Sequence, residues 1–145
     1  MKVSRSALLP YSVDQMYDVV ADIPSYPAFL SWCEDSQVIR ESEHEVIAKL
    51  VISYAKLSFE FTTRNNNIKN QSIELNLVDG PFTSLSGIWK FQALNEQGCK
   101  VSIDMDFDFD NPIAKKMFGK MFSKIVSTQL DAFQSRAKVL YGVNK

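Results

Sequence analysis

Alternation of apolar and polar residues runs through the middle of this sequence and constrains the fold more than any other feature. Short turn-forming stretches such as NNNIKN, DGPF and NEQG interrupt it. Because connections this short join neighbouring strands that run in opposite directions, we expect an antiparallel sheet. The alternating segments, each typical of a strand with one buried face, are residues 36–42, 45–53, 56–64, 71–78, 83–94 and 99–109.

A strand and two short helices are predicted before this region. The segment KVSRSALL, residues 2–9, alternates loosely and predicts a strand. Ser12 and Gln15 form a capping box in front of apolar residues at helical spacing, which predicts a helix that ends before the first following proline. Ser25 is suited to cap a second, shorter helix that reaches about Leu30.

The last part of the chain predicts a long amphipathic helix. Asn111 suits the N-cap and Pro112 the first helical position, and Gly142 lies just past the end, about 30 residues later. Its apolar residues cover close to half of the helix surface. The elements together predict one domain over residues 1–145 with an α+β fold, in which a curved antiparallel sheet of about seven strands wraps around the C-terminal helix.

A straight helix and a strongly curved sheet cannot touch along their whole length, so side chains or a ligand must fill the gap. The segment DIPSYPAFLSWCED, residues 22–35, is rich in large apolar side chains and too irregular for one helix or strand. It is placed to cover such a gap, although ordinary core packing would explain the same residues. If a cavity is present, the pattern predicts that these residues line it: Tyr26, Phe59, Phe61, Leu75, Leu77, Leu85, Trp89, Phe91, Met105, Phe107 and Met117.

The sequence lacks the residue combinations that common catalytic sites need. The single histidine, His44, lies between charged residues at an expected hairpin tip. Cys33 and Cys99 make neither a disulfide framework nor a zinc site. A phosphate-binding glycine loop and a nucleophile elbow are also missing. We therefore expect no enzyme, no catalytic residue, no metal and no required cofactor.

Charge is nearly balanced in this chain, with a net charge of −1. Together with the lack of a signal peptide and of the ~20 apolar residues that cross a bilayer, this predicts a cytoplasmic protein that does not bind DNA. Contact with a polyanion needs a local patch. The candidate for RNA phosphates or an acidic membrane surface is a set of four lysines on the long helix, with a solvated helix surface as the alternative: Lys115, Lys116, Lys120 and Lys124.

Four aspartates alternate along the last predicted strand: Asp104, Asp106, Asp108 and Asp110. Alternate residues share one face of a strand and lie about 6.5–7 Å apart. One cation cannot bind all of them at ligand distances of about 2.3–2.6 Å. We interpret them as a solvated strand face, with Lys90 as a cross-strand partner.

Three long stretches carry the more specific motifs of the sequence. They read MYDVVADIPSYPAFLSWCEDSQVI, LVDGPFTSLSGIWKFQAL and FDFDNPIAKKMFGKMFSKIVSTQLDAFQSRAKVLYG. Together they resemble the coenzyme-Q-binding START-like family of the polyketide cyclase-like superfamily, over about residues 1–142. Ser31 departs from the pattern, since the family favours proline before the tryptophan.

The resemblance implies a helix-grip fold with a hydrophobic tunnel between sheet and helix and no catalytic residues. By position it adds these residues to the expected lining: Phe29, Leu30, Trp32, Phe82, Phe118, Met121, Phe122 and Ile125.

Two functions follow from the resemblance. The first, and our main expectation, is binding of a polyprenyl quinone such as ubiquinone in support of respiration. The second comes from the bacterial branch with its ribosome-association toxins: binding of the large ribosomal subunit, which blocks subunit association and inhibits translation. A cyclase or aromatase-like enzyme is a weaker alternative. The expected partners are a hydrophobic small molecule, the large subunit, and transiently the surface of the inner membrane.

Overall fold

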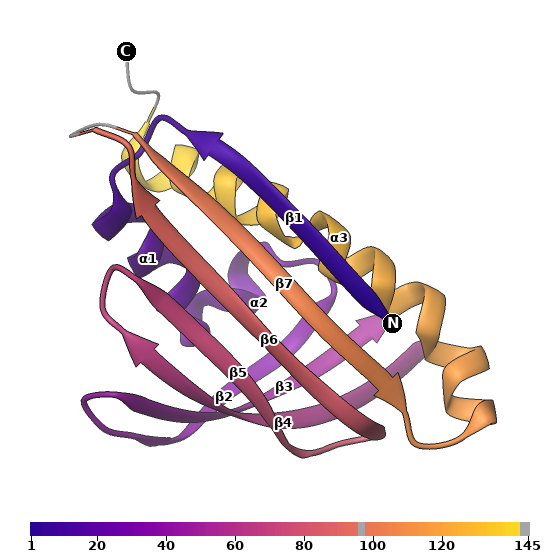
Figure 1. Cartoon of the computed structure of the whole chain (residues 1–145). Coiled ribbons are helices and arrows are strands. Elements are labelled where there is room, and N and C mark those ends of the chain that lie inside the picture. The colour runs from indigo at the N-terminus through magenta and orange to yellow at the C-terminus, as the bar shows by residue number, and fades with distance from the viewer. Residues whose placement is uncertain (96–97, 143–145) are drawn as a thin grey trace.

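The computed structural model describes residues 1–95 and 98–142 and contains one seven-stranded sheet and a long C-terminal helix (Figure 1). The predicted α+β class is confirmed, and every predicted strand and helix is present. The turn predicted at NEQG includes residues 96–97, which lie outside the described residues. In chain order the elements are β1 (Lys2–Leu9), α1 (Val13–Ala21), the 3-10 turn η1 (Ile23–Ser25), α2 (Tyr26–Phe29), β2 (Cys33–Glu41), β3 (Glu45–Tyr54), β4 (Leu57–Ile68), β5 (Ser72–Asp79), β6 (Phe82–Ala93), β7 (Cys99–Phe109) and α3 (Pro112–Tyr141).

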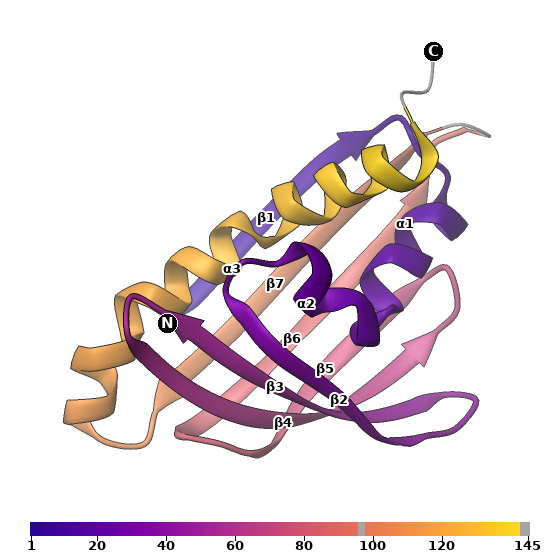
Figure 2. The same cartoon turned by 180° about the vertical axis from the view of Figure 1, so that it is seen from behind.

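The sheet has the strand order β1-β7-β6-β5-β4-β3-β2, and every neighbouring pair is antiparallel. Strands β2 to β7 form the predicted meander, and β1 pairs with β7. The register shifts in the β2–β3, β4–β5 and β6–β7 pairs. Such bulges bend and twist a sheet locally. The curved sheet holds α3, α1 and α2 on the same face, which is the expected helix-grip arrangement (Figure 2).

Local sequence signals set the helix boundaries. The Ser12 hydroxyl accepts a hydrogen bond from the Gln15 amide at 3.4 Å, and the Gln15 side chain accepts one from the Ser12 amide at 3.0 Å. At the start of α3, the Asn111 side chain accepts from the Ala114 amide at 2.8 Å. Gly142 follows α3 with φ 77°, a left-handed conformation that costs glycine little. The predicted caps of α1 and α3 are therefore confirmed.

Two local predictions are wrong. Residues 65–68, predicted as part of a turn, belong to β4, and the chain turns later, where Asn70 has φ 62°. Asn65 and Asn67 pair with β5, so strand pairing overrides the low strand propensity of asparagine. Ser25 does not cap α2: its hydroxyl donates to the Asp22 carboxylate at 2.6 Å, and η1 precedes the helix.

Aromatic side chains near the N-terminal end of α3 pack it tightly against the sheet. The Phe122 ring lies 4.8 Å from that of Phe107, and the Phe118 ring lies 4.8 Å from that of Phe59, measured between ring centroids. Phe82 also contacts Phe122, at 5.3 Å. Offset and edge-on aromatic pairs of this kind add to the stabilisation from buried area. We call this group the N-terminal aromatic cluster.

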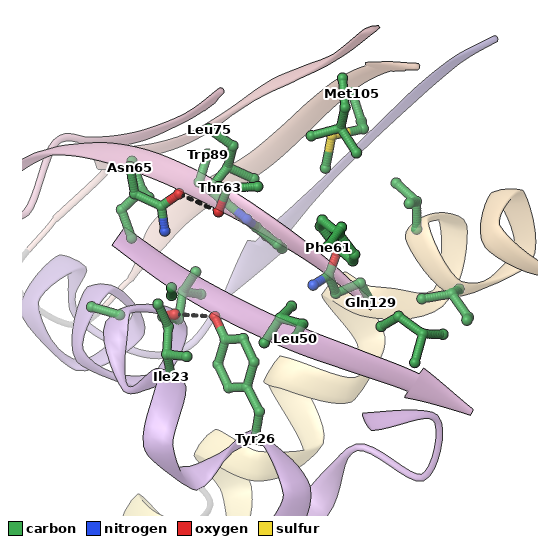
Figure 3. A pocket seen from close by; sticks show the side chains of 18 of the residues that line it. Ile23, Tyr26, Leu50, Phe61, Thr63, Asn65, Leu75, Trp89, Met105 and Gln129 are labelled. Atoms are coloured by element: carbon green, nitrogen blue, oxygen red, sulfur yellow. Dashed lines mark hydrogen bonds between the residues drawn. The ribbon is translucent and has the colours of Figure 1, made fainter. Parts of the chain in front are cut away.

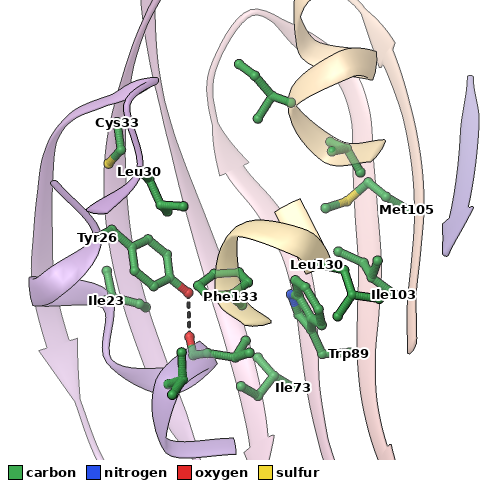
Figure 4. Packing of buried hydrophobic residues seen from close by; sticks show 14 of the residues in the cluster. Ile23, Tyr26, Leu30, Cys33, Ile73, Trp89, Ile103, Met105, Leu130 and Phe133 are labelled. Atoms are coloured by element: carbon green, nitrogen blue, oxygen red, sulfur yellow. Dashed lines mark hydrogen bonds between the residues drawn. The ribbon is translucent and has the colours of Figure 1, made fainter. Parts of the chain in front are cut away.

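A second group of aromatic rings holds α3 further along its length. Phe133, fully buried, lies between Tyr26 and Trp89, with centroid distances of 5.4 and 5.3 Å (Figure 4). Phe29 adds a further contact with Phe133 at 5.8 Å. We call this group the C-terminal aromatic cluster. Between the two clusters α3 has smaller or polar side chains, Ile125, Val126 and Gln129, and the packing there is incomplete.

The two buried thiols predict how stability depends on pH. Burial raises the pKa of Cys33 and of Cys99 from 9.0 to about 11. The unfolded chain therefore loses these protons at a lower pH than the folded protein does, so stability falls as pH rises. We expect the free energy of unfolding, measured by urea denaturation, to decline between about pH 9 and about pH 11. A Cys33→Ala, Cys99→Ala variant should decline less steeply, and an equal decline would contradict the assignment.

Candidate functional site

A cavity lies between the concave face of the sheet and the middle of α3, on the side covered by η1 and α2 (Figure 3). Its volume, counted as the space open to the centre of a water-sized sphere, is about 60 Å³. The two aromatic clusters border it along α3. Its lining residues are Val20, Ala21, Ile23, Tyr26, Trp32, Ala48, Leu50, Ile52, Phe61, Thr63, Asn65, Asn67, Ile73, Leu75, Leu85, Trp89, Met105, Phe122, Ile125, Val126 and Gln129.

The size of the cavity limits what it holds without a movement of its walls. A water molecule needs roughly 10–15 Å³ of such space, so the cavity has room for about four to six waters. This is comparable to about one five-carbon isoprene unit. We call residues 22–35, which cover the cavity, the covering segment. A polyprenyl chain of several units would need the covering segment or α3 to move.

Nine of the predicted lining residues lie on the cavity wall. They come from the covering segment, from four strands and from α3, so elements far apart in the sequence meet there. That these residues bind a ligand stays a prediction. The nine are Tyr26, Trp32, Phe61, Leu75, Leu85, Trp89, Met105, Phe122 and Ile125.

The other predicted lining residues lie elsewhere, chiefly because the aromatic rings pack on each other. Phe59, Phe82, Phe107 and Phe118 belong to the N-terminal aromatic cluster. Met117 is 46% exposed on the outer surface of α3, so its assignment to the cavity is wrong.

Five further residues fill positions around the cavity instead of lining it. Phe91 packs on Tyr17, and Phe29 on Phe133. The remaining three predicted residues also belong to the core or its edge. Leu30 and Met121 are buried in the core, and Leu77 is half-buried beside it. For these residues the ordinary core interpretation holds.

Sequence analysis missed the polar part of the wall. Thr63, Asn65 and Asn67 on β4 and Gln129 on α3 line the cavity, and none was a candidate. The three β4 residues continue the inward-facing positions that begin with Phe59 and Phe61. The two-residue period of the strand could have predicted them. It continues into the asparagine-rich stretch, where the sequence suggested a turn.

The covering segment is anchored to its surroundings by hydrogen bonds. The Tyr26 hydroxyl donates to the Val20 carbonyl, and the Ser36 hydroxyl donates to the Ile23 carbonyl at 2.8 Å. Burial raises the pKa of Tyr26 well above its usual range, so this phenol stays neutral. The segment therefore closes the cavity with a fixed aromatic side chain.

The lysines predicted as an anion-binding site are exposed. Lys116, Lys120 and Lys124 follow one another on the surface of α3 away from the sheet, and Ile113 and Met117 lie among them. We call these five residues the basic strip. Within residues 1–95 and 98–142, no ion pair engages its lysines. Lys115 is exposed beside it.

The aspartates of β7 form an exposed face, as predicted, but their partner differs from the prediction. Lys90 lies opposite Ser102 and makes no ion pair in the described part of the chain. Asp106 and Asp108 lie 3.8 and 3.7 Å from the N-terminal ammonium group. The Ser4 hydroxyl donates to Asp104 at 2.6 Å. The partners therefore come from Met1 and from Ser4 of β1.

Groups suited to catalysis do not converge in the described residues. His44 is exposed at a hairpin tip beside Glu43. Within the described part, no three His, Cys, Asp or Glu side chains are grouped to hold a metal ion. Tyr26 is the one described wall residue with an acid–base side chain, and its hydroxyl already bonds to the backbone. No helix in the part described is long and apolar enough to cross a membrane.

Comparison with known proteins identifies the family. Residues 9–134 match the family described as polyketide cyclase/dehydrase and lipid transport, which is most of the chain. The chain belongs to this family. The expected resemblance to its START-like members is confirmed.

Relatives with two kinds of name are similar to this chain. The ribosome association toxin RatA of Pseudomonas aeruginosa is 47% identical over 140 residues, which cover 97% of both chains. RatA of Escherichia coli K12 is 42% identical over 97% of this chain and 89% of its own. A more distant relative, the mitochondrial coenzyme Q-binding protein COQ10 homolog B of Xenopus laevis, is 25% identical over 98% of this chain and 60% of its own.

Solved structures support the fold. The Zhui aromatase/cyclase from Streptomyces sp. R1128 superposes with a TM-score of 0.86 over 99% of both chains, at 17% identity. A START superfamily protein from Mycobacterium smegmatis has a TM-score of 0.80 at 18% identity, over 96% of this chain and 98% of its own. At such identities the likeness concerns the fold alone.

Two residues of α3 test the cavity geometry. Phe122 is 3% exposed and lines the cavity, whereas Met117 lies on the outer surface of the same helix. We expect Phe122→Ala to lower the free energy of unfolding by about 3–5 kcal/mol, because it removes a ring and enlarges a void. Met117→Ala should change it by no more than about 0.5 kcal/mol. Urea denaturation measures both, and similar losses would contradict the placement of Met117.

Proposed function

We propose that this protein acts by associating with the ribosome, through contact with the large subunit that blocks its joining to the small subunit. The observation that carries the proposal is the 47% identity to the ribosome association toxin RatA over 97% of both chains. The quinone relative is far less similar, at 25%. The proposal reverses our order of expectation and assigns the protein to the cytoplasm, where ribosomes act.

The basic strip supports this proposal and supplies a surface for ribosomal RNA. Its three lysines recur every four residues, so their backbone positions rise by about 6 Å from one to the next. They lie on the solvent side of α3 without competing ion pairs in the described residues. The net charge of −1 means that attraction to RNA must come from such a patch. Lys115 lies close enough along the helix to add a fourth contact.

The dependence of binding on salt tests the role of the basic strip. With four phosphate contacts, the logarithm of the affinity should fall with the logarithm of salt concentration with a slope of about −3 to −3.5. Replacing Lys116, Lys120 and Lys124 by Glu should weaken binding to large subunits by about tenfold or more. It should also reduce the magnitude of the salt-dependence slope by about 2 to 3. Co-sedimentation with purified subunits at several salt concentrations measures both quantities.

A matched variant controls for net charge. Lys56, Lys90 and Lys100 are exposed and lie outside α3, and their replacement by Glu changes the charge by the same amount. This variant should retain most of its binding. Equal losses in the two variants would mean that overall charge, and not the basic strip, governs association.

Quinone binding is the second candidate function, and the apolar cavity behind Tyr26 and Trp32 favours it. Most of its wall is apolar, and the family description includes lipid transport. Against it stands the volume of about 60 Å³, which requires the covering segment to move before a polyprenyl chain enters. A catalytic function has less support, because no carboxylate or histidine lies among the described wall residues.

Native mass spectrometry of protein purified from its own host tests quinone binding. If the second candidate is right, the wild-type protein carries the mass of a polyprenyl quinone. Ala48→Leu should reduce that fraction, because Ala48 is buried on the cavity wall and a larger side chain there occupies the space. Ala93→Leu, at an exposed position of β6, should leave it unchanged. A wild-type protein free of quinone would remove this candidate.

A further inference from the structure

One side of the cavity wall is polar, which an ordinary apolar core would not need. Thr63 and Asn65 are 8% and 5% exposed, and the Thr63 hydroxyl donates to the Asn65 amide oxygen at 2.8 Å (Figure 3). Asn67 follows on the same face of β4. We call these three residues the polar row. Buried polar groups cost free energy unless they are hydrogen-bonded, so the polar row needs an explanation.

The polar row has hydrogen-bonding groups to spare on the cavity side. The Asn65 oxygen is engaged by Thr63, and among the described residues its amide nitrogen has no hydrogen-bond partner. The Asn67 side chain contacts the Tyr17 hydroxyl, yet its oxygen is buried and has no partner. The row therefore offers one free donor to the cavity, the Asn65 nitrogen, because the Asn67 oxygen is covered by its neighbours. From α3, Gln129 brings a further amide to the wall.

The rest of the wall defines what a ligand must look like. No charged side chain occurs among the described lining residues, so an ionised ligand would lose its hydration without gaining a counter-charge. Beyond the polar row, the wall is formed by side chains such as Trp89, Phe122 and Ile125, which suit an apolar body. Space for about four to six waters admits roughly as many non-hydrogen atoms.

We propose that the cavity binds a compact, uncharged molecule with a small apolar body and a polar end that both donates and accepts hydrogen bonds, such as a hydroxyl or carboxamide. The polar end accepts a hydrogen bond from the Asn65 nitrogen and donates one to the Gln129 amide oxygen across the cavity (Figure 3). This ligand differs from a polyprenyl quinone, which is larger and whose carbonyl oxygens only accept. The inference depends on neither ribosome association nor quinone binding, since the basic strip lies on the other side of α3.

A titration with three small probes tests the inference on the whole protein. The probes are cyclopentanol, cyclopentane as its apolar counterpart, and isobutyrate as a charged molecule of similar size. Side-chain amide signals in nitrogen-15 NMR spectra report on Asn65 and Gln129 directly. We expect saturable shifts with cyclopentanol, binding about fivefold or more tighter than that of cyclopentane, and no saturable shifts with isobutyrate.

Two variants separate the hydrogen bonds from the volume of the cavity. Asn65→Leu should weaken cyclopentanol binding by about fivefold to tenfold without weakening cyclopentane, whereas Asn66→Leu, on the exposed face of β4, should change neither. Gly87→Ala should weaken the binding of both cyclopentanol and cyclopentane. A Cβ there lies 2.6 Å from the Met105 sulfur and displaces that flexible side chain, which also lines the cavity.

Crystals of the wild-type protein soaked in cyclopentanol give a check that depends on no variant. The inference requires the ligand oxygen within hydrogen-bond distance of the Asn65 nitrogen. It is overturned if the cavity holds ordered waters only, if cyclopentane binds as tightly as cyclopentanol, or if Asn65→Leu keeps the preference of the wild-type protein.

Discussion

The packing of one straight helix against a curved sheet governs the rest of this structure. Two aromatic clusters hold α3, one built on Phe118 and Phe122 and the other on Phe133. Aromatic rings are large and rigid, so each cluster fixes the distance between helix and sheet where it lies. Between them the smaller side chains of Ile125 and Val126 do not fill the remaining space. The cavity is thus a consequence of how the helix is supported at two points.

The same helix separates two surfaces that differ in their chemistry. Its inner surface closes a small, largely apolar cavity with a polar row, and its outer surface carries the basic strip. Because α3 is held at both clusters, a change on one surface need not disturb the other. One fold thus presents two separate surfaces, and relatives within the family are named for ribosome association and for coenzyme Q binding. Which surface dominates here depends on the chemistry of the side chains and not on the fold.

Much of the fold and part of the candidate site could be predicted from the sequence. The strands follow from alternation on the pleat, and the ends of α3 from Asn111 and Gly142, because these signals act within a few residues. Met117 was misplaced because apolar residues cover close to half of the helix surface, which leaves the exact edge of the buried surface open. The asparagines of β4 were read as a turn because their pairing with β5 is not a local property.

The sequence by itself determined the order of the elements, the antiparallel meander, the long helix and the exposure of its lysines, since period and capping are local properties. Only the tertiary structure decided the volume of the cavity and its lining. Both depend on how bulky rings from separate elements pack together, and on which face of β4 meets α3. The polar row became visible only there, since Asn65 and Asn67 acquire their meaning from the apolar side chains that surround them.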